Sequence, residues 1–169
     1  PESRYAADAK YRVGECSYYL NDFKTATVEL ETYLADHEGH NLNSWARLLL
    51  GESWNRLQQF PKAEAVLKPL LAGPPPANIL ADSSYAMALS LEGQNKIEEA
   101  VQLHEQVADM KSDNFSHKSL FRIAGLYFQN GDYVQAGTMF DRVATDFPDK
   151  PLAGPAALQS GVARYRLKQ

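Results

Sequence analysis

The chain has little cysteine, no long apolar run and no excess of basic residues. Cys16 is the single cysteine, which excludes an internal disulfide framework. No run of about 18 or more apolar residues occurs, so the sequence gives no signal for a membrane-spanning helix. Lysine and arginine together number 17 against 21 aspartates and glutamates, for a formal net charge of −4. This balance argues against a general affinity for nucleic acid or for an anionic membrane surface.

The motifs that usually mark catalysis are also missing. No phosphate-binding glycine loop, zinc-binding helix signature or nucleophile elbow occurs in the sequence. Cys16 has no histidine at helical spacing and is expected to be a small core residue rather than a nucleophile. His37 and His40 flank Gly39 without a third ligand, so they do not predict a metal site. We therefore predict no enzymatic activity, no cofactor and no bound metal.

Four alanines recur at nearly constant intervals along the chain. Ala26, Ala63, Ala100 and Ala136 are separated by 37, 37 and 36 residues. A period in this range is typical of repeat proteins, in which each unit buries its apolar face only against its neighbours. Stacked helical units present a curved surface rather than an enclosed catalytic pocket. The period therefore favours a binding function.

Each repeat divides into two segments whose apolar residues lie three and four positions apart, the period of an α-helix. Small residues stand at equivalent points of the first segments. They are Gly14, Gly51, Ala88 and Ala124. Together with the four periodic alanines of the second segments, they predict that the two helices of each hairpin approach closely, so that a larger side chain would overpack the contact.

Local signals refine this pattern. Gly131 suits a left-handed helix C-cap, and Pro61 suits the first turn of a helix. Pro69 removes a hydrogen bond to Ala65 and is predicted to kink its helix or end it early. His104 occupies a packing position, where we expect a buried or half-buried histidine hydrogen-bonded to a neighbour.

The period and the placement of small residues resemble the tetratricopeptide repeat (TPR) family, whose unit has about 34 residues. The resemblance implies an all-α fold, an α-α superhelix of right-handed helical-hairpin repeats. It covers 1–169 as a single domain, with repeats at about 7–40, 44–77, 81–114 and 117–150 and a further helix at 155–168. The fourth repeat carries the pattern most completely. The chain begins at Pro1 without a methionine, and we expect it to be a fragment of a longer protein.

In the TPR family, the first helix of each repeat lines a concave face that binds partners. Carrying the family's positions onto this chain predicts a groove rich in aromatic residues and arginine, residue types that dominate binding hot spots. The candidate partner-binding residues are Tyr11, Arg12, Tyr19, Trp45, Leu48, Arg56, Tyr85, Phe121 and Arg122. At least half of the wider set of concave positions is expected to pack as core instead, especially Tyr18 and Phe128.

One TPR specificity is predicted to be absent. TPR domains that bind the acidic C-termini of cytosolic chaperones use a clamp of lysine, asparagine and arginine. The corresponding positions here hold Tyr11, Glu15, Leu49, Asp82 and Ala86. Glu15 and Asp82 would repel a carboxylate, so we predict that chaperone tails do not bind.

The leading hypothesis is a non-enzymatic scaffold that binds a partner protein or peptide in the concave groove. Two alternatives remain: a substrate-positioning or regulatory module of a larger cell-envelope enzyme or assembly machine, and a self-assembling solenoid that forms a homo-oligomer. Links such as Phe147-Pro148-Asp149 are similar to those of bacterial cell-envelope TPR proteins, which favours a periplasmic or cell-envelope location, although cytoplasmic TPR proteins also use them. No nucleic-acid partner is predicted, because no basic stripe accompanies the aromatic residues.

Overall fold

In the computed structural model, the described residues are 5–73 and 75–168, and their regular structure is entirely helical. No strand occurs within these ranges, so the predicted all-α class is confirmed. The described helices are α1 (Ala6–Tyr19), α2 (Phe23–Asp36), α3 (Asn43–Arg56), α4 (Phe60–Ala72), α5 (Ala77–Gly93), α6 (Ile97–Asp109), α7 (Ser116–Gln129), α8 (Tyr133–Asp146) and α9 (Ala153–Arg166).

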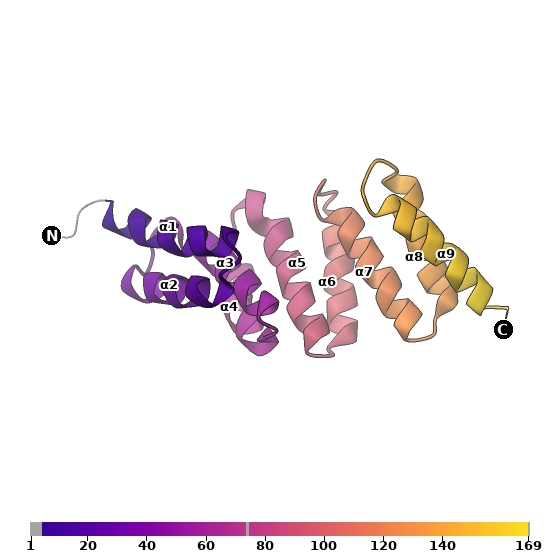
Figure 1. The fold of residues 1–169 in the computed structure, drawn as a ribbon, viewed down its shortest axis with the longest axis horizontal. Helices are drawn as coiled ribbons and strands as arrows, with labels where there is room; N and C mark the ends of the chain where they lie inside the picture. The colour runs from indigo at the N-terminus through magenta and orange to yellow at the C-terminus, as the bar shows by residue number, and fades with distance from the viewer. Residues whose placement is uncertain (1–4, 74, 169) are drawn as a thin grey trace. The chain divides into compact units, whose positions relative to one another are not determined.

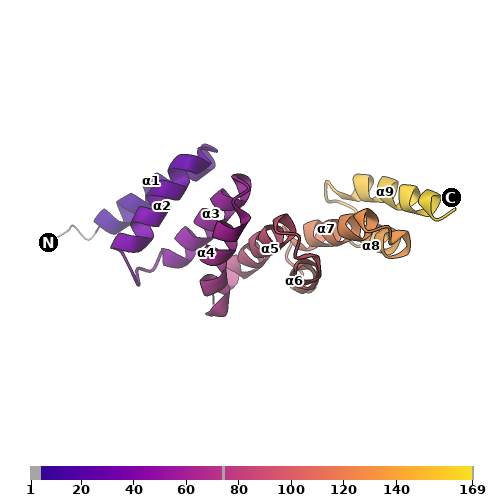
Figure 2. The ribbon, with the colours of Figure 1, turned by 90° about the horizontal axis from the view of Figure 1, so that it is seen from below.

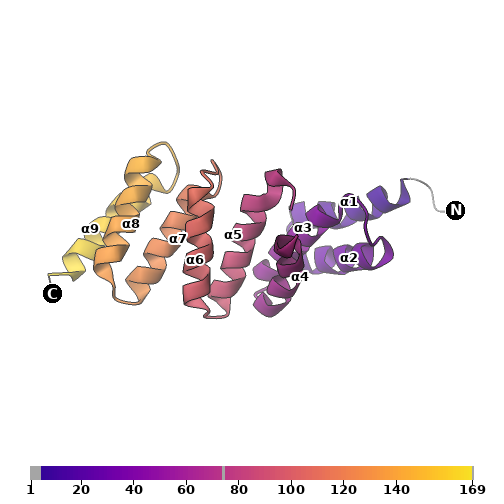
Figure 3. The ribbon, with the colours of Figure 1, turned by 180° about the vertical axis from the view of Figure 1, so that it is seen from behind.

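The chain divides after Lys96 into two compact units. In the first, α1 packs on α2, α2 on α3, α3 on α4 and α4 on α5 (Figure 1). Figure 2 shows α1 with α2, and α3 with α4, as neighbouring pairs. In the second unit, α6 packs on α7, α7 on α8 and α8 on α9 (Figure 3). The predicted third repeat, 81–114, spans the division, and the repeat boundaries stay a prediction.

The first helices of the first unit also contact one another directly. α3 lies against both α1 and α5. The outward faces of α1, α3 and α5 are therefore neighbours, while α2 and α4 pack behind them as hairpin partners. This arrangement places side chains that are far apart in the sequence on one continuous surface.

A left-handed residue ends α1, α3, α5 and α7, and these residues repeat with the period of the alanines. They are Asn21, Gln58, Asn95 and Gly131, with φ values of 61°, 57°, 60° and 81°. The N–H that follows each of them bonds back five residues, as Asp22 N–H does to the Ser17 carbonyl at 2.9 Å. This is the hydrogen-bond pattern of a Schellman C-cap. The left-handed cap predicted at Gly131 is thus confirmed, and three non-glycine residues adopt the same conformation.

The helices that follow these turns begin with different caps. Asp22 accepts a hydrogen bond from the Thr25 N–H at 3.1 Å, and Asp132 accepts one from the Gln135 N–H at 3.1 Å. These bonds satisfy N–H groups that the first turn of a helix leaves unpaired. α4 instead carries Pro61 in its first turn, as predicted.

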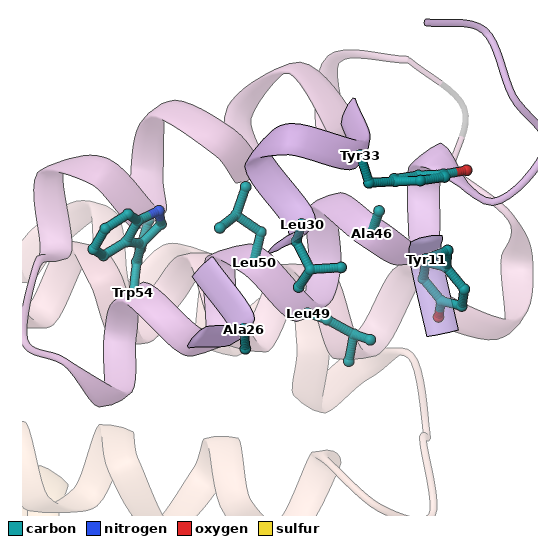
Figure 4. Close-up of a cluster of buried hydrophobic side chains, with 9 residues drawn as sticks. Tyr11, Ala26, Leu30, Tyr33, Ala46, Leu49, Leu50 and Trp54 are labelled. Carbon is teal, nitrogen blue, oxygen red and sulfur yellow. The ribbon is translucent and has the colours of Figure 1, made fainter. Parts of the chain in front are cut away.

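The core of the first unit lies between the helices of the hairpins. Ala26 and Ala63 have no exposed surface. Figure 4 shows Leu30 beside Leu49 and Leu50, in a cluster that joins the first hairpin to α3. At one end of this cluster the Tyr11 and Tyr33 rings meet edge to face, with centroids 5.7 Å apart.

The predicted close approach within each hairpin is present in the first two. A Cβ atom on Gly14 would lie 2.7 Å from the Leu30 side chain, and one on Gly51 would lie 2.5 Å from the Leu67 side chain. Both leucines are fully buried in the core. The glycines are therefore required by packing rather than by backbone conformation.

The second unit has an equivalent core. Ala124 and Ala136 are fully buried beside Ile123, Phe140 and Val143. His104 is also fully buried, with its Nδ1 3.2 Å from the Ser119 hydroxyl oxygen. The expectation of a buried histidine bonded to a neighbour is confirmed.

The expected burial of Cys16 and the expected early end of α4 at Pro69 were both wrong, while the alternative of a kink at Pro69 stays a prediction. Cys16 is exposed, because it lies two positions, or about 200°, around the helix from the buried Gly14. α4 does not end at Pro69 but continues to Ala72. The burial of Leu67 and Leu70 on either side of the proline accounts for this, since it holds the last turn of α4 against the core.

Glu64 on α4 fixes the end of α5. Its carboxylate accepts hydrogen bonds from Lys96 Nζ and Gln94 Nε2, each at 2.7 Å. The lysine bond lowers the pKa of Glu64 against the opposing effect of burial. Nearby, a Cβ on Gly93 would lie 2.4 Å from the Phe60 ring, so the same two helices also meet closely through apolar atoms.

Replacing Gly51 by alanine is expected to lower the free energy of unfolding by about 1–3 kcal/mol, because the methyl group must displace the buried Leu67. Gly161 in α9 is the matched control, since a Cβ there meets no described atom within 4 Å. Gly161→Ala is expected to stabilise by about 0.5–1 kcal/mol through helix propensity. Urea unfolding measures both effects, and a stabilised Gly51→Ala variant would contradict the close approach.

Stability should depend on pH through Glu64. Folding lowers the pKa of Glu64, so its ionised carboxylate stabilises the folded state above the unfolded pKa of about 4.3. This contribution is lost as the pH falls through the pKa of the folded state. We expect Glu64→Gln to be less stable than wild type at neutral pH, with the difference shrinking as the pH falls below the unfolded pKa. Urea unfolding across this range tests the linkage, and a difference independent of pH would refute it.

Candidate functional site

A groove of about 430 Å³ lies on the first unit, over α1 and α3. Its lining residues follow the helical period, so each helix contributes one face. From α1 come Tyr11, Arg12, Glu15, Tyr18 and Tyr19, and from α3 come Trp45, Leu48, Leu49 and Glu52. Leu42 directly precedes α3, and Asp82 comes from α5. The groove is thus built on the row of first helices, where the TPR resemblance predicts a binding face.

Aromatic side chains form much of its wall. Tyr19 is 70% exposed, and its ring meets the half-buried Tyr18 ring edge to face at 5.3 Å. Trp45 is half-buried and packs against the apolar clusters of the unit. Tyr11 is only 2% exposed and forms part of the floor. The groove therefore offers one well-exposed ring supported by others that are fixed in the core.

The tyrosine hydroxyls hold two of the carboxylates. Tyr11 donates a hydrogen bond to Glu15 Oε1 at 3.0 Å, and Tyr18 donates one to Glu52 Oε2 at 2.6 Å. Burial raises the pKa of both phenols, and the adjacent carboxylates raise it further. The hydroxyls consequently remain protonated donors at neutral pH and fix the orientation of the carboxylates.

Arg12 supplies the positive charge among the lining residues. Its guanidinium forms an ion pair with Glu15 and lies over the Tyr11 ring, with Cζ 5.4 Å from the ring centroid. The groove thus combines three carboxylates, one guanidinium and several aromatic rings. The sequence pattern predicts a groove rich in aromatic residues and arginine, and the lining has the aromatic rings but holds more carboxylates than arginines.

The structure brings together five of the nine predicted binding residues. Tyr11, Arg12, Tyr19, Trp45 and Leu48 all line the groove. Tyr11 and Leu48 are nearly buried, so their role there is largely to shape the floor. The other three present more of their side chains to solvent.

The remaining predicted residues lie elsewhere. Arg56 is exposed at the end of α3, with its Cζ 5.8 Å from the Phe23 ring centroid. Tyr85 is half-buried on α5 and does not line the groove. Phe121 and Arg122 belong to the second unit, where Phe121 packs on Phe140 with centroids 5.2 Å apart. Phe121 is therefore largely a packing residue.

Leu42 is the lining residue that sequence reasoning missed. It precedes α3 as its N-cap residue and so falls outside the helical positions of the TPR pattern. Its partial burial against the core cluster brings the start of α3 over the groove. An apolar residue directly before a helix is the signal that would have indicated it.

The described part of the chain contains no group of three or more His, Cys, Asp or Glu that could hold a metal ion. His37 and His40 instead surround Tyr33, whose hydroxyl lies 2.7 Å from His40 Nδ1. Within the described ranges, no helix is both long and apolar enough to cross a membrane.

Residues 118–150 match the family model of the tetratricopeptide repeat. This segment contains most of α7 and all of α8, and corresponds to the repeat that carries the pattern most completely. A search of curated proteins gave no match. The TPR resemblance inferred from the sequence is confirmed by this match together with the structural comparisons.

Several solved structures share the fold, and the names of two of them refer to TPR repeats. MamA from Desulfovibrio magneticus RS-1, from residue 41 to its end, gives a TM-score of 0.72 at 18% identity, over 83% of this chain and 75% of that one. A putative kinesin light chain from Podospora anserina with nearly identical TPR-like repeats gives a TM-score of 0.75 at 16% identity. The match covers 100% of this chain and 90% of that one. A tetratricopeptide repeat protein from Parabacteroides merdae gives a TM-score of 0.75 at 15% identity. The match covers 96% of this chain and 61% of that one. These likenesses confirm the predicted helical-hairpin solenoid fold.

The Tyr18–Glu52 hydrogen bond should contribute measurably to stability. Tyr18→Phe leaves a partly buried carboxylate without this donor, and we expect a loss of about 1–3 kcal/mol in the free energy of unfolding. Tyr133→Phe is the matched control, because the half-buried Tyr133 hydroxyl has no hydrogen bond among the described residues. A double-mutant cycle with Glu52→Gln isolates the pair, and a coupling energy near zero would show that the bond does not fix the groove wall.

Proposed function

We propose that this chain is a non-enzymatic protein-interaction scaffold whose groove over α1 and α3 binds an extended or helical segment of a partner protein. The TPR match at 118–150 and the TPR fold support a scaffold role. The groove itself carries the proposal, because it combines the exposed Tyr19 ring with the half-buried Trp45 on a pre-formed surface. Apolar clefts with a few fixed polar groups are typical binding sites.

The chemistry of the lining suits a peptide more than a catalytic reaction. Binding in such grooves is dominated by a few aromatic or arginine anchors surrounded by weaker contacts. The fixed floor of Tyr11 and Leu48 reduces the entropy lost on binding, because these side chains are already ordered. A partner side chain inserted beside Tyr19 would bury the one ring that solvent now surrounds.

Self-assembly is a second candidate, supported by a different surface. Leu158 and Tyr165 on α9 are 68% and 64% exposed, and exposed apolar groups of this kind mark protein contacts when they form a patch. Sedimentation at increasing protein concentration tests this candidate. A shift to dimers that Leu158→Ser abolishes would support it, while a monomer at every concentration would exclude it.

The role as a substrate-positioning or regulatory module of a larger cell-envelope enzyme or assembly machine remains a proposal of the same kind. A peptide-binding groove serves that role and a free scaffold equally well. The full-length sequence distinguishes the two, because the module requires a catalytic or assembly domain elsewhere in the chain.

Groove binding depends on Tyr19 in this proposal. A displayed library of random 12-residue peptides is selected on the wild-type chain, and the enriched peptides are measured by fluorescence anisotropy. Tyr19→Ala is expected to weaken binding about tenfold or more, because hot-spot aromatics are worth about 2 kcal/mol or more. Tyr5→Ala is the matched control, since Tyr5 is 69% exposed but does not line the groove.

The folded state is checked in both variants. Because Tyr19 is mostly exposed, its loss is expected to leave the unfolding midpoint nearly unchanged. If no enriched peptide depends on Tyr19, the groove is not the binding site and the proposal fails.

A further inference from the structure

We infer that the partner segment is cationic: the groove recognises a stretch of peptide that carries arginine or lysine side chains. This inference rests on the proposed function, since it names the chemistry of what occupies the same groove. It follows from the charges of the lining, from their placement among aromatic rings, and from the way the groove already holds a guanidinium of its own chain.

The first observation is the sign of the charge. Glu15, Glu52 and Asp82 line the groove, against the single guanidinium of Arg12. These residues come from three different helices, so their charges converge on one concave surface rather than running along one solvated helix face. A concave site in which one sign of charge is in excess attracts an incoming ligand of the opposite sign.

The second observation is the combination of carboxylates with aromatic rings. An arginine guanidinium can stack on an aromatic face while its N–H groups donate to a carboxylate, and a lysine ammonium gains a similar attraction from the ring. The exposed Tyr19 ring and the half-buried Trp45 lie in the same groove as Glu15 and Glu52. Both parts of a cation site are therefore present together.

Arg12 shows this mode of recognition within the molecule. Its guanidinium lies over the Tyr11 ring at 5.4 Å and pairs with Glu15 on the same helix. A guanidinium from a partner would meet the same chemistry along the groove, where Tyr18 and Glu52 form a second pair of phenol and carboxylate. A phenol and a carboxylate thus lie together at two places in the groove. At one of these places they already hold the guanidinium of Arg12.

The third observation is that the carboxylates are held in place. The Tyr11 and Tyr18 hydroxyls donate to Glu15 and Glu52. A carboxylate accepts about four hydrogen bonds, so the tyrosine bond orients each carboxylate without using its whole acceptor capacity. Carboxylates fixed before binding lose little conformational freedom when a cation arrives.

An acidic segment fits the groove poorly. Its carboxylates would approach Glu15, Glu52 and Asp82 in a partly desolvated cleft, where like charges repel strongly. An uncharged apolar segment would use the rings but would desolvate the carboxylates without bringing a positive charge to them. A cationic segment satisfies both groups of lining residues.

The test begins with the peptides selected from the random 12-residue library. Peptides that lose binding to Tyr19→Ala identify the groove, and their sequences are compared with the unselected library. We expect lysine and arginine to be enriched and aspartate and glutamate to be depleted. A synthetic peptide from this set is then measured beside two versions in which every lysine and arginine is replaced by glutamine or by glutamate.

Charge variants of the protein give effects of opposite sign. Glu52→Gln and Asp82→Asn are each expected to lower the affinity for the cationic peptide by about three- to tenfold, in line with the loss of one charge-assisted contact. Arg12→Gln is expected to raise the affinity for this peptide by about two- to fivefold, because the substitution removes the positive charge of the lining. Glu31→Gln is the matched control, since exposed Glu31 on α2 lies outside the groove.

The outcomes separate the inference from the function on which it rests. Enrichment of lysine and arginine, with tighter binding to Arg12→Gln, supports both. Tyr19-dependent peptides without basic enrichment, or with acidic residues enriched, overturn the cationic partner and leave the scaffold proposal intact. If no peptide depends on Tyr19, the proposed function fails and the inference fails with it.

Discussion

The close contact between the two helices of a hairpin is the constraint on which the rest of the structure depends. Leu30 and Leu67 fill the space that a Cβ on Gly14 or Gly51 would occupy, and Ala26 is completely enclosed. At this distance neither helix can rotate about its own axis without a clash. The rotation of the first helix is therefore set by its smallest residue, and every other side chain on it takes its direction from there.

The groove is a consequence of that fixed rotation. With Gly14 facing α2, Tyr11 (one turn before it) and Glu15 (one position after it) lie on the part of α1 that lines the groove, and Leu48 and Glu52 stand in the same positions relative to Gly51. α3 contacts both α1 and α5, so these outward faces join into one surface. The same small residues that make packing possible thus decide which side chains can meet a partner.

Much of this could be predicted from the sequence, because the hairpin period and the small residues leave few alternatives. The limits are equally physical. Family positions give the direction of a side chain but not its depth, so Tyr11 and Leu48 were placed on the binding face although they are nearly buried in its floor. Leu42 precedes α3, so a pattern of helical positions does not include it. Cys16 was placed in the core by its residue type, although its position two residues after the buried Gly14 turns it to solvent.

The charge of the groove is the feature that the repeat pattern constrains least. Packing requires small or apolar residues at the hairpin contact but accepts any residue that reaches solvent from the first helices. The carboxylate at position 52 also has a structural role, because Tyr18 on α1 donates a hydrogen bond to Glu52 on α3 at 2.6 Å. Reversing the charge at position 52 with a lysine would remove an interhelical acceptor and leave the half-buried Tyr18 hydroxyl without it. The groove's acidic character is thus tied to its architecture, since the residue that gives the wall its charge also joins α1 to α3.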